Sequence, residues 1–169
     1  MKLIEGLKKN KELQIKADDL RAKVSKYCAD QSHETAVYGD KQRDQIKEWI
    51  QAHHDVLQEI AKLRIAVQRT NLATNVTIEL GGVQVTKSIA EWIHRRKDLA
   101  NGELSMWTGI GDRNLKEGTV KTSTGELQEI KIRRYYDPKE RDTNVELYRT
   151  EPGIIDRTLE TVNAITDMI

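Results

Sequence analysis

The fold is decided by residues 41–71, which have the sequence KQRDQIKEWIQAHHDVLQEIAKLRIAVQRTN. Large side chains recur there every three or four residues, at Ile46, Trp49, His53, Val56, Ile60, Leu63 and Val67. This period places them on one stripe of an α-helix. At 1.5 Å per residue the helix is about 45 Å long, so it needs a second long element to cover its stripe.

A matching stripe lies earlier in the chain. Apolar residues step by four and three along the first thirty residues, at Leu13, Ala17, Leu20, Val24 and Tyr27. Residues 30–40 are polar or small and are typical of a loop. We therefore predict an antiparallel helical hairpin over residues 1–72. His53 is the polar interruption of its seam, a feature that often fixes register or oligomeric state.

The period changes from helical to alternating after Asn71. Residues 76–80 alternate apolar and polar side chains, and Gly81-Gly82 separates them from Val83, which predicts a β-hairpin over residues 75–86. Ser88 and Glu91 have the spacing of a capping box, so we expect a third helix over residues 88–107. Asn101-Gly102 could end this helix early, or it could continue to Trp107.

The last third of the chain predicts a second hairpin and a final helix. The hairpin occupies residues 119–136 around Gly125, and Asp137-Pro138 ends its outgoing strand. The final helix occupies residues 151–169 and begins near Thr150, whereas residues 138–152 stay unassigned. The expected fold is mainly α with small β-hairpins (α+β) in a single domain, residues 1–169, with a coiled-coil-like helical hairpin.

Composition excludes several classes of protein. The chain has 169 residues, a formal net charge of +1 and one cysteine, so an internal disulfide is impossible and bulk charge favours no polyanion. No apolar run approaches the roughly 18 residues of a membrane span, and the N-terminus has no signal-peptide core. We expect no membrane partner and a cytoplasmic location in a bacterium, or a virion if the chain is phage-encoded.

No motif predicts a catalytic, cofactor-binding or metal site. His53 and His54 are adjacent, so on a helix they point about 100° apart and cannot readily share a metal ion. Cys28 has no base beside it in sequence, and we expect a half-buried, inert thiol. The segment Gly109-Ile110-Gly111-Asp112 lacks the third glycine of a phosphate-binding loop. The sequence therefore predicts no enzyme and no cofactor.

One basic cluster keeps nucleic-acid binding open as an alternative. It comprises Lys131, Arg133, Arg134 and Tyr135. On a strand, Lys131, Arg133 and Tyr135 would share one face, which could hold a phosphate backbone and stack a base. Acidic residues follow at 137, 140 and 142 and offset the positive field, which favours a solvated hairpin edge instead.

Several short strings resemble the septicolysin-like proteins, which are small bacterial and phage-borne chains of helical-hairpin type. The strings are MKLIEGL at residues 1–7, Arg69-Thr70-Asn71 with Thr74, SIAE running into RRKDL over residues 88–99, and Ile155-Asp156-Arg157. The order of elements agrees as well. The resemblance implies a fold and no known catalysis, although the family name implies a thiol-dependent cytolysin. The aromatic ending associated with the family is missing here.

The function expected from these observations is that of a non-enzymatic structural or assembly protein. It would self-associate or decorate a larger particle, such as a bacteriophage virion. Ile50 and Leu57 flank the seam of the long helix and need cover from another element or a second subunit. The residues considered for this interface are Ile50, Leu57, Trp92, Ile155, Leu159 and Val162.

Overall fold

The computed structural model describes residues 1–169, which divide into two compact units. Unit 1 comprises residues 1–74 and 160–169, and unit 2 comprises residues 75–159. Helix α5 (Pro138–Ile165) contributes residues to both. Each unit is described by itself, and the expectation of a single domain stays a prediction.

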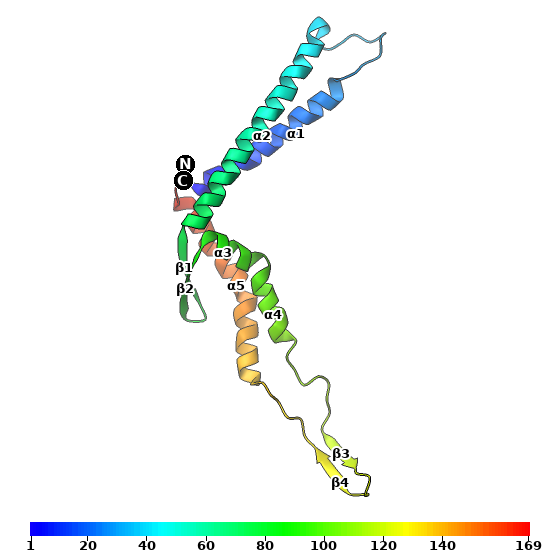
Figure 1. Cartoon of the computed structure of the whole chain (residues 1–169), viewed down its shortest axis with the longest axis vertical. Coiled ribbons are helices and arrows are strands. Elements are labelled where there is room, and N and C mark those ends of the chain that lie inside the picture. Colours follow the sequence, from blue (N-terminus) through cyan, green and yellow to red (C-terminus); the bar gives the residue numbers. More distant parts are fainter. The chain divides into compact units, whose positions relative to one another are not determined.

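Unit 1 is the helical hairpin that the sequence predicts. Helix α1 (Leu3–Tyr27) is joined to α2 (Gln42–Ala73) through a loop that ends in a short 3-10 turn, Gly39–Lys41. The two helices run side by side (Figure 1). Their core comprises Leu13, Ala17 and Leu20 of α1 with Val56, Ile60 and Leu63 of α2. The predicted seam is confirmed, because its three- and four-residue spacing turns these side chains toward one another.

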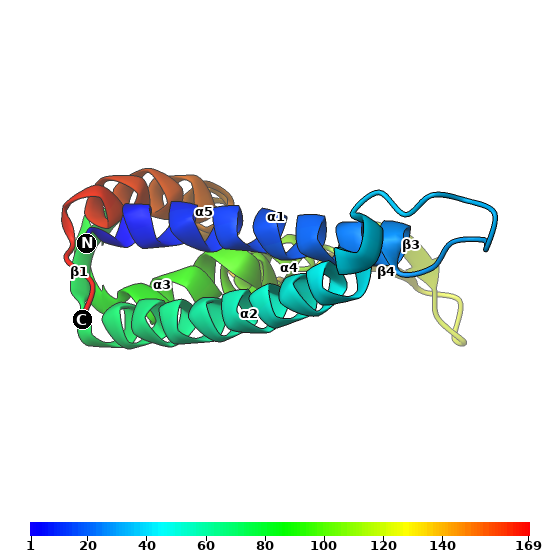
Figure 2. The same ribbon diagram turned by 90° about the horizontal axis from the view of Figure 1, so that it is seen from above.

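The two chain ends meet in unit 1, at the end away from the loop (Figure 2). The Met168 amide donates to the Met1 carbonyl, and the Leu3 amide donates to the Thr166 carbonyl, both at 2.9 Å. The Ile169 amide donates to Oγ1 of Thr70 at 3.0 Å. Thr70 is fully buried, so the tail is held against α2 by a shielded hydrogen bond.

Unit 2 begins with the predicted hairpin of β1 (Asn75–Leu80) and β2 (Val83–Ser88). Leu80 pairs with Val83 across Gly81 and Gly82, whose φ angles of 57° and 80° require glycine-like freedom. Ser88 and Glu91 form the expected capping box.

The third helix has the longer of its two expected lengths and continues past Trp107. Helix α3 (Ile89–His94), a π-helical segment (Arg95–Leu99) and α4 (Ala100–Thr108) follow one another without a break. Asn101-Gly102 therefore does not end the helix. The indole Nε1 of Trp92 donates to the Val76 carbonyl at 2.9 Å, which ties α3 to β1.

The second hairpin is shorter than predicted. It consists of β3 (Gly118–Lys121) and β4 (Leu127–Ile130), with Gly118 paired to Ile130. The expected strand through Tyr136 is wrong. Strand β3 begins at Gly118, which pairs with Ile130, so residues 131–136 have no strand to pair with. The Ile132 amide donates instead to the Glu117 carboxylate, at 3.2 Å.

The last helix begins earlier and ends earlier than predicted. Helix α5 starts at Pro138 and stops at Ile165, and Pro152 lies inside it. A carboxylate oxygen of Asp137 accepts a hydrogen bond from the Lys139 amide at 2.8 Å. Asp137 is therefore a helix N-cap and Pro138 occupies the first helical position, where proline is favoured. The α+β fold with four main helices and two hairpins is otherwise confirmed.

Candidate functional site

Helix α2 has a second apolar stripe beside the one that packs on α1. Its members are Ile50, Leu57, Ile65 and Leu72, which are 54%, 45%, 49% and 67% exposed. They follow one another after seven, eight and seven residues, so they share one face of the helix. The structure thus leaves Ile50 and Leu57 about half exposed, and it adds two residues to the predicted pair. We name these four residues the outward stripe.

Charges are segregated around the outward stripe. Helical periodicity places the basic side chains of Arg43, Lys47, His54 and Arg64 on its face. The exposed carboxylates of α2 lie about 100° or more around the helix from the stripe, at Asp44, Glu48, Asp55 and Glu59. The stripe is therefore apolar with a basic border and contains no acidic side chain.

The seam histidine borders a small cavity between α1 and α2. His53 is half-buried, and it lines a cavity of about 260 Å³ together with Ile50, Val24, Ser25 and Arg21. This cavity adjoins the outward stripe through Ile50. Neighbouring His54 is exposed, so the two histidines face different surroundings, as the helical geometry predicts.

Three of the other four interface candidates are buried, and the fourth is partly buried. Trp92 and Ile155 are fully buried and Leu159 is 3% exposed, all within unit 2. Val162 is partly buried on α5. Trp92, Ile155 and Leu159 therefore cannot meet a partner, because their apolar stripes already pack inside the chain. Cys28 differs from expectation in the opposite direction, because its thiol is exposed at the end of α1.

A second open cavity lies in unit 2, between two loop segments. In Figure 1 these loops connect α4 and α5 to the β3–β4 hairpin. The volume of the cavity is about 390 Å³. One wall comes from residues 110–115 and the other from residues 132–136. The structure thus brings together two sequence segments that we considered separately, the glycine-containing loop and the basic cluster. We call it the arginine pocket.

A carboxylate joins the two walls of the arginine pocket. Asp112 accepts hydrogen bonds from Nε of Arg134 at 2.8 Å and from the hydroxyl of Tyr136 at 2.7 Å. These two donors, the guanidinium first, lower the pKa of Asp112 from 3.8 to about 2. Asp112 in turn raises the pKa of Arg134. Arg141 supports the Asp112 side by donating to the Ile110 carbonyl at 3.4 Å.

The basic cluster is divided by this geometry. Arg133, Arg134 and Tyr135 line the arginine pocket, whereas Lys131 does not. Lys131 instead forms a loose ion pair with Glu129 at 3.6 Å. The expectation that Lys131, Arg133 and Tyr135 share a strand face is wrong, because residues 131–136 form no strand.

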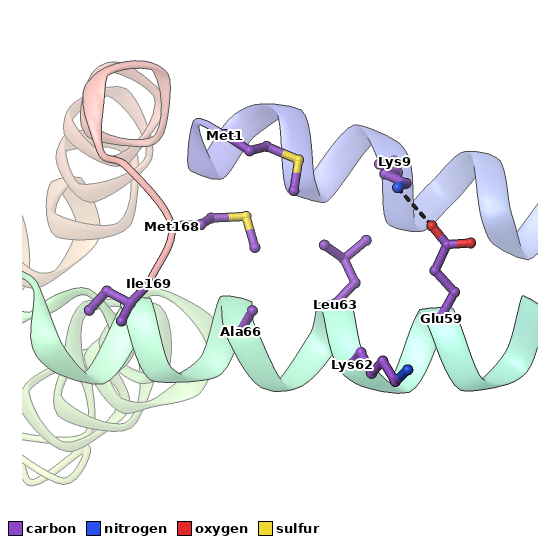
Figure 3. A pocket seen from close by; sticks show the side chains of 8 residues that line it. All are labelled: Met1, Lys9, Glu59, Lys62, Leu63, Ala66, Met168 and Ile169. Atoms are coloured by element: carbon purple, nitrogen blue, oxygen red, sulfur yellow. Dashed lines mark ion pairs between the residues drawn. The ribbon is translucent and has the colours of Figure 1, made fainter.

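The chain ends border a third cavity, which is open to solvent and has a volume of about 350 Å³ (Figure 3). The side chains of Met1, Met168 and Leu63 project into it, and the ion pair between Lys9 and Glu59 spans α1 and α2 beside it, with 2.7 Å between Nζ and Oε1. That ion pair lowers the pKa of Glu59. The predominantly apolar lining makes this cavity a packing feature of the tail.

One ion pair in unit 2 had no sequence signal. Nε and Nη2 of Arg95 each donate to a carboxylate oxygen of Glu151 at 2.8 Å. Glu151 is 2% exposed, and it stands one helical turn before Ile155 on the buried stripe of α5. The pair raises the pKa of Arg95, and it fixes the π-helical segment against α5.

No three His, Cys, Asp or Glu side chains gather so as to hold a metal ion. No helix is both long enough and apolar enough to cross a membrane.

No protein-family model matches the chain, and a search of curated proteins finds no match. Among solved structures the chain is similar to the crystal structure of a functionally unknown conserved protein from Corynebacterium diphtheriae. The two share 18% sequence identity with a TM-score of 0.60, over 100% of this chain and 99% of the other. The likeness is one of fold. The septicolysin-like resemblance stays a prediction.

Proposed function

We propose that the chain is a non-enzymatic assembly protein that associates with further copies of itself through the outward stripe of α2. The observation that carries this proposal is the exposure of Ile50, Leu57, Ile65 and Leu72 along one helix face. Exposed apolar side chains that recur along one helix face are typical of an interaction site.

The length of the outward stripe favours a helical partner. From Ile50 to Leu72 it extends about 33 Å along the helix axis, and its period of seven to eight residues is that of a helix–helix seam. A second copy supplies a rod of the same length and period.

The β3–β4 hairpin supports the proposal independently. Every residue of both strands is exposed, including Val120, Leu127 and Ile130 at 48%, 72% and 41%. A two-stranded hairpin with no core is marginally stable in water. Contact with a neighbouring copy would give this hairpin the apolar cover that its own chain does not provide.

Light scattering on the full chain tests the proposal with Leu57→Lys and a matched control, Gln51→Lys. Both variants add one positive charge to an exposed position of α2, but only residue 57 belongs to the outward stripe. We expect the unmodified protein to have the mass of a dimer or larger oligomer of the 19.4 kDa chain. Leu57→Lys should move it toward the monomer mass with unchanged helical circular dichroism, and Gln51→Lys should not.

Two results would contradict self-assembly. The first is a monomer mass for the unmodified protein at high concentration. The second is equal association of the Leu57→Lys and Gln51→Lys variants, because a stripe-mediated contact distinguishes these two positions.

A further inference from the structure

The arginine pocket contains positive charge that no protein group neutralises. Arg113, Arg133 and Arg134 line it, and Asp112 is its one carboxylate. Both oxygens of that carboxylate accept hydrogen bonds from Arg134, and one of them also accepts the Tyr136 hydroxyl. Neither Arg113 nor Arg133 forms an ion pair or a side-chain hydrogen bond. Two free guanidinium groups therefore border one concavity.

The position of Arg113 is fixed by a constrained turn. Arg113 and Asn114 have φ angles of 55° and 58°, a backbone region that a long side chain such as arginine rarely adopts. The turn is closed by the Leu115 amide, which donates to the Asp112 carbonyl at 2.9 Å. Because the Asp112 carboxylate is also tied to Arg134, the turn holds Arg113 at the edge of the pocket opposite Arg133.

An unused aromatic ring completes the lining. Tyr135 is 89% exposed although it borders the cavity, so its ring is free to pack against a planar group. Tyrosine rings stack on nucleobases without regard to base identity. The volume of about 390 Å³ is within the range of small-ligand sites.

We propose that the arginine pocket binds a nucleotide, with the phosphate on Arg113 and Arg133 and the base against Tyr135. Guanidinium groups bind phosphate oxygens through paired, charge-assisted hydrogen bonds. The nucleotide can be free or one unit of a single strand, since both present the same phosphate and base. The Asp112 pair with Arg134 then acts as the brace that keeps the two walls at a fixed separation. This site is independent of the outward stripe of α2.

Calorimetric titration of the full chain at low salt tests this proposal. The probes are ADP, adenosine, inorganic phosphate and a short oligouridylate. We expect ADP to bind one site per chain, and adenosine and phosphate alone to bind at least about tenfold more weakly because each lacks one half of the recognition. Tighter binding of the oligouridylate than of ADP would identify the ligand as a strand.

Variants locate the binding on the pocket. Arg113→Gln and Arg133→Gln remove unpaired charges and leave the Asp112 contacts intact, and each should weaken ADP binding about tenfold. Tyr135→Ala should weaken the binding of ADP but not that of phosphate. Lys131→Gln is the matched control, because it removes an equal charge from the same segment but outside the lining, and it should change affinity less than twofold.

Three outcomes would overturn the proposal. The first is that neither ADP nor the oligouridylate binds at millimolar concentration. The second is that inorganic phosphate binds as tightly as ADP, which would make the pocket a simple anion site. The third is that Lys131→Gln weakens binding as much as Arg133→Gln, which would mean that only diffuse charge attracts the ligand.

Discussion

Arg95 and Glu151 form a two-point ion pair in which the carboxylate is the buried partner. Each of its oxygens accepts one guanidinium hydrogen bond at 2.8 Å. The Glu151 side chain is 2% exposed and that of Arg95 is 21% exposed. The centre of the Tyr148 ring lies 5.8 Å from the guanidinium carbon. Glu151 therefore depends on Arg95 for charge compensation, whereas Arg95 keeps some contact with water.

Removing Arg95 should strongly destabilise the protein. Arg95→Met leaves a buried carboxylate without its partner, and we expect the free energy of unfolding to fall by about 3–5 kcal/mol. Arg96→Met is the matched control, because the ion pair of Arg96 with Asp156 is 39% and 61% exposed and should contribute less than about 1 kcal/mol. Urea unfolding followed by circular dichroism measures both, and equal losses would contradict this account.

The Asp112 contacts predict a pH dependence at the acid end. The pKa of Asp112 is lowered from 3.8 to about 2, chiefly by Arg134. A lowered pKa in the folded state means that the contact stabilises the fold above pH 3.8 and loses this effect as the pH falls toward 2. Carboxyl NMR titration should give a midpoint near the lower value. In Arg134→Gln the midpoint should rise toward the ordinary value, and an unchanged midpoint would contradict the assignment.

Gly6 and Met168 should be energetically coupled. A Cβ atom added at Gly6 would overlap the sulfur of Met168, so Gly6→Ala must displace that side chain. Alanine in a helix is otherwise favoured over glycine by about 1 kcal/mol. We expect Gly6→Ala to stabilise a Met168→Ala background by about that amount and the unmodified protein by less. Thermal unfolding of the double-mutant cycle measures this, and additive effects would refute it.

Cys28 should be dispensable for fold and association. The thiol is exposed and has a single long contact, from Sγ to the Ser25 carbonyl at 3.5 Å. We expect Cys28→Ala to change the free energy of unfolding by less than about 0.5 kcal/mol. Its mass in solution should stay that of the unmodified protein. Loss of association without loss of helicity would revive the thiol-dependent interpretation.

The helical hairpin could be predicted because its signals are local and repeated. Leu13, Ala17 and Leu20 on α1 and Val56, Ile60 and Leu63 on α2 each follow a helical period, and all six form the observed core. Gly81-Gly82 and the Ser88–Glu91 capping box are likewise short-range signals with one physical solution. Both are present in the structure.

The first half of α5 was missed because its start signal has two meanings. Asp137-Pro138 ends a strand when the preceding residues pair, but it caps a helix when they do not. The observed Lys139 amide bond to Asp137 shows the second case. Pro152 then suggested a helix start at Thr150, although the structure tolerates it inside α5.

The arginine pocket could not be predicted because it depends on contacts across the chain. Asp112 and Arg134 are separated by 22 residues, and neither belongs to a helix or strand whose period would orient it. The sequence identified the basic residues but predicted that they lie on a strand through Tyr136. In the structure this strand ends at Ile130. Half of the outward stripe could be predicted, because Ile50 and Leu57 flank the predicted seam. Ile65 and Leu72 were not among the residues predicted to flank it.

Thr70 bears on the order of events during synthesis. The helices α1 and α2 leave the ribosome early, but Thr70 receives its hydrogen bond from Ile169, which is translated ninety-nine residues later. Until then the Thr70 end of the hairpin lacks the strap formed by residues 160–169, and Leu63 lacks its neighbour Met168. N-terminal domains usually fold first during translation. Here the N-terminal unit reaches its native form only after unit 2 has been made, so the two units must mature in an interleaved order.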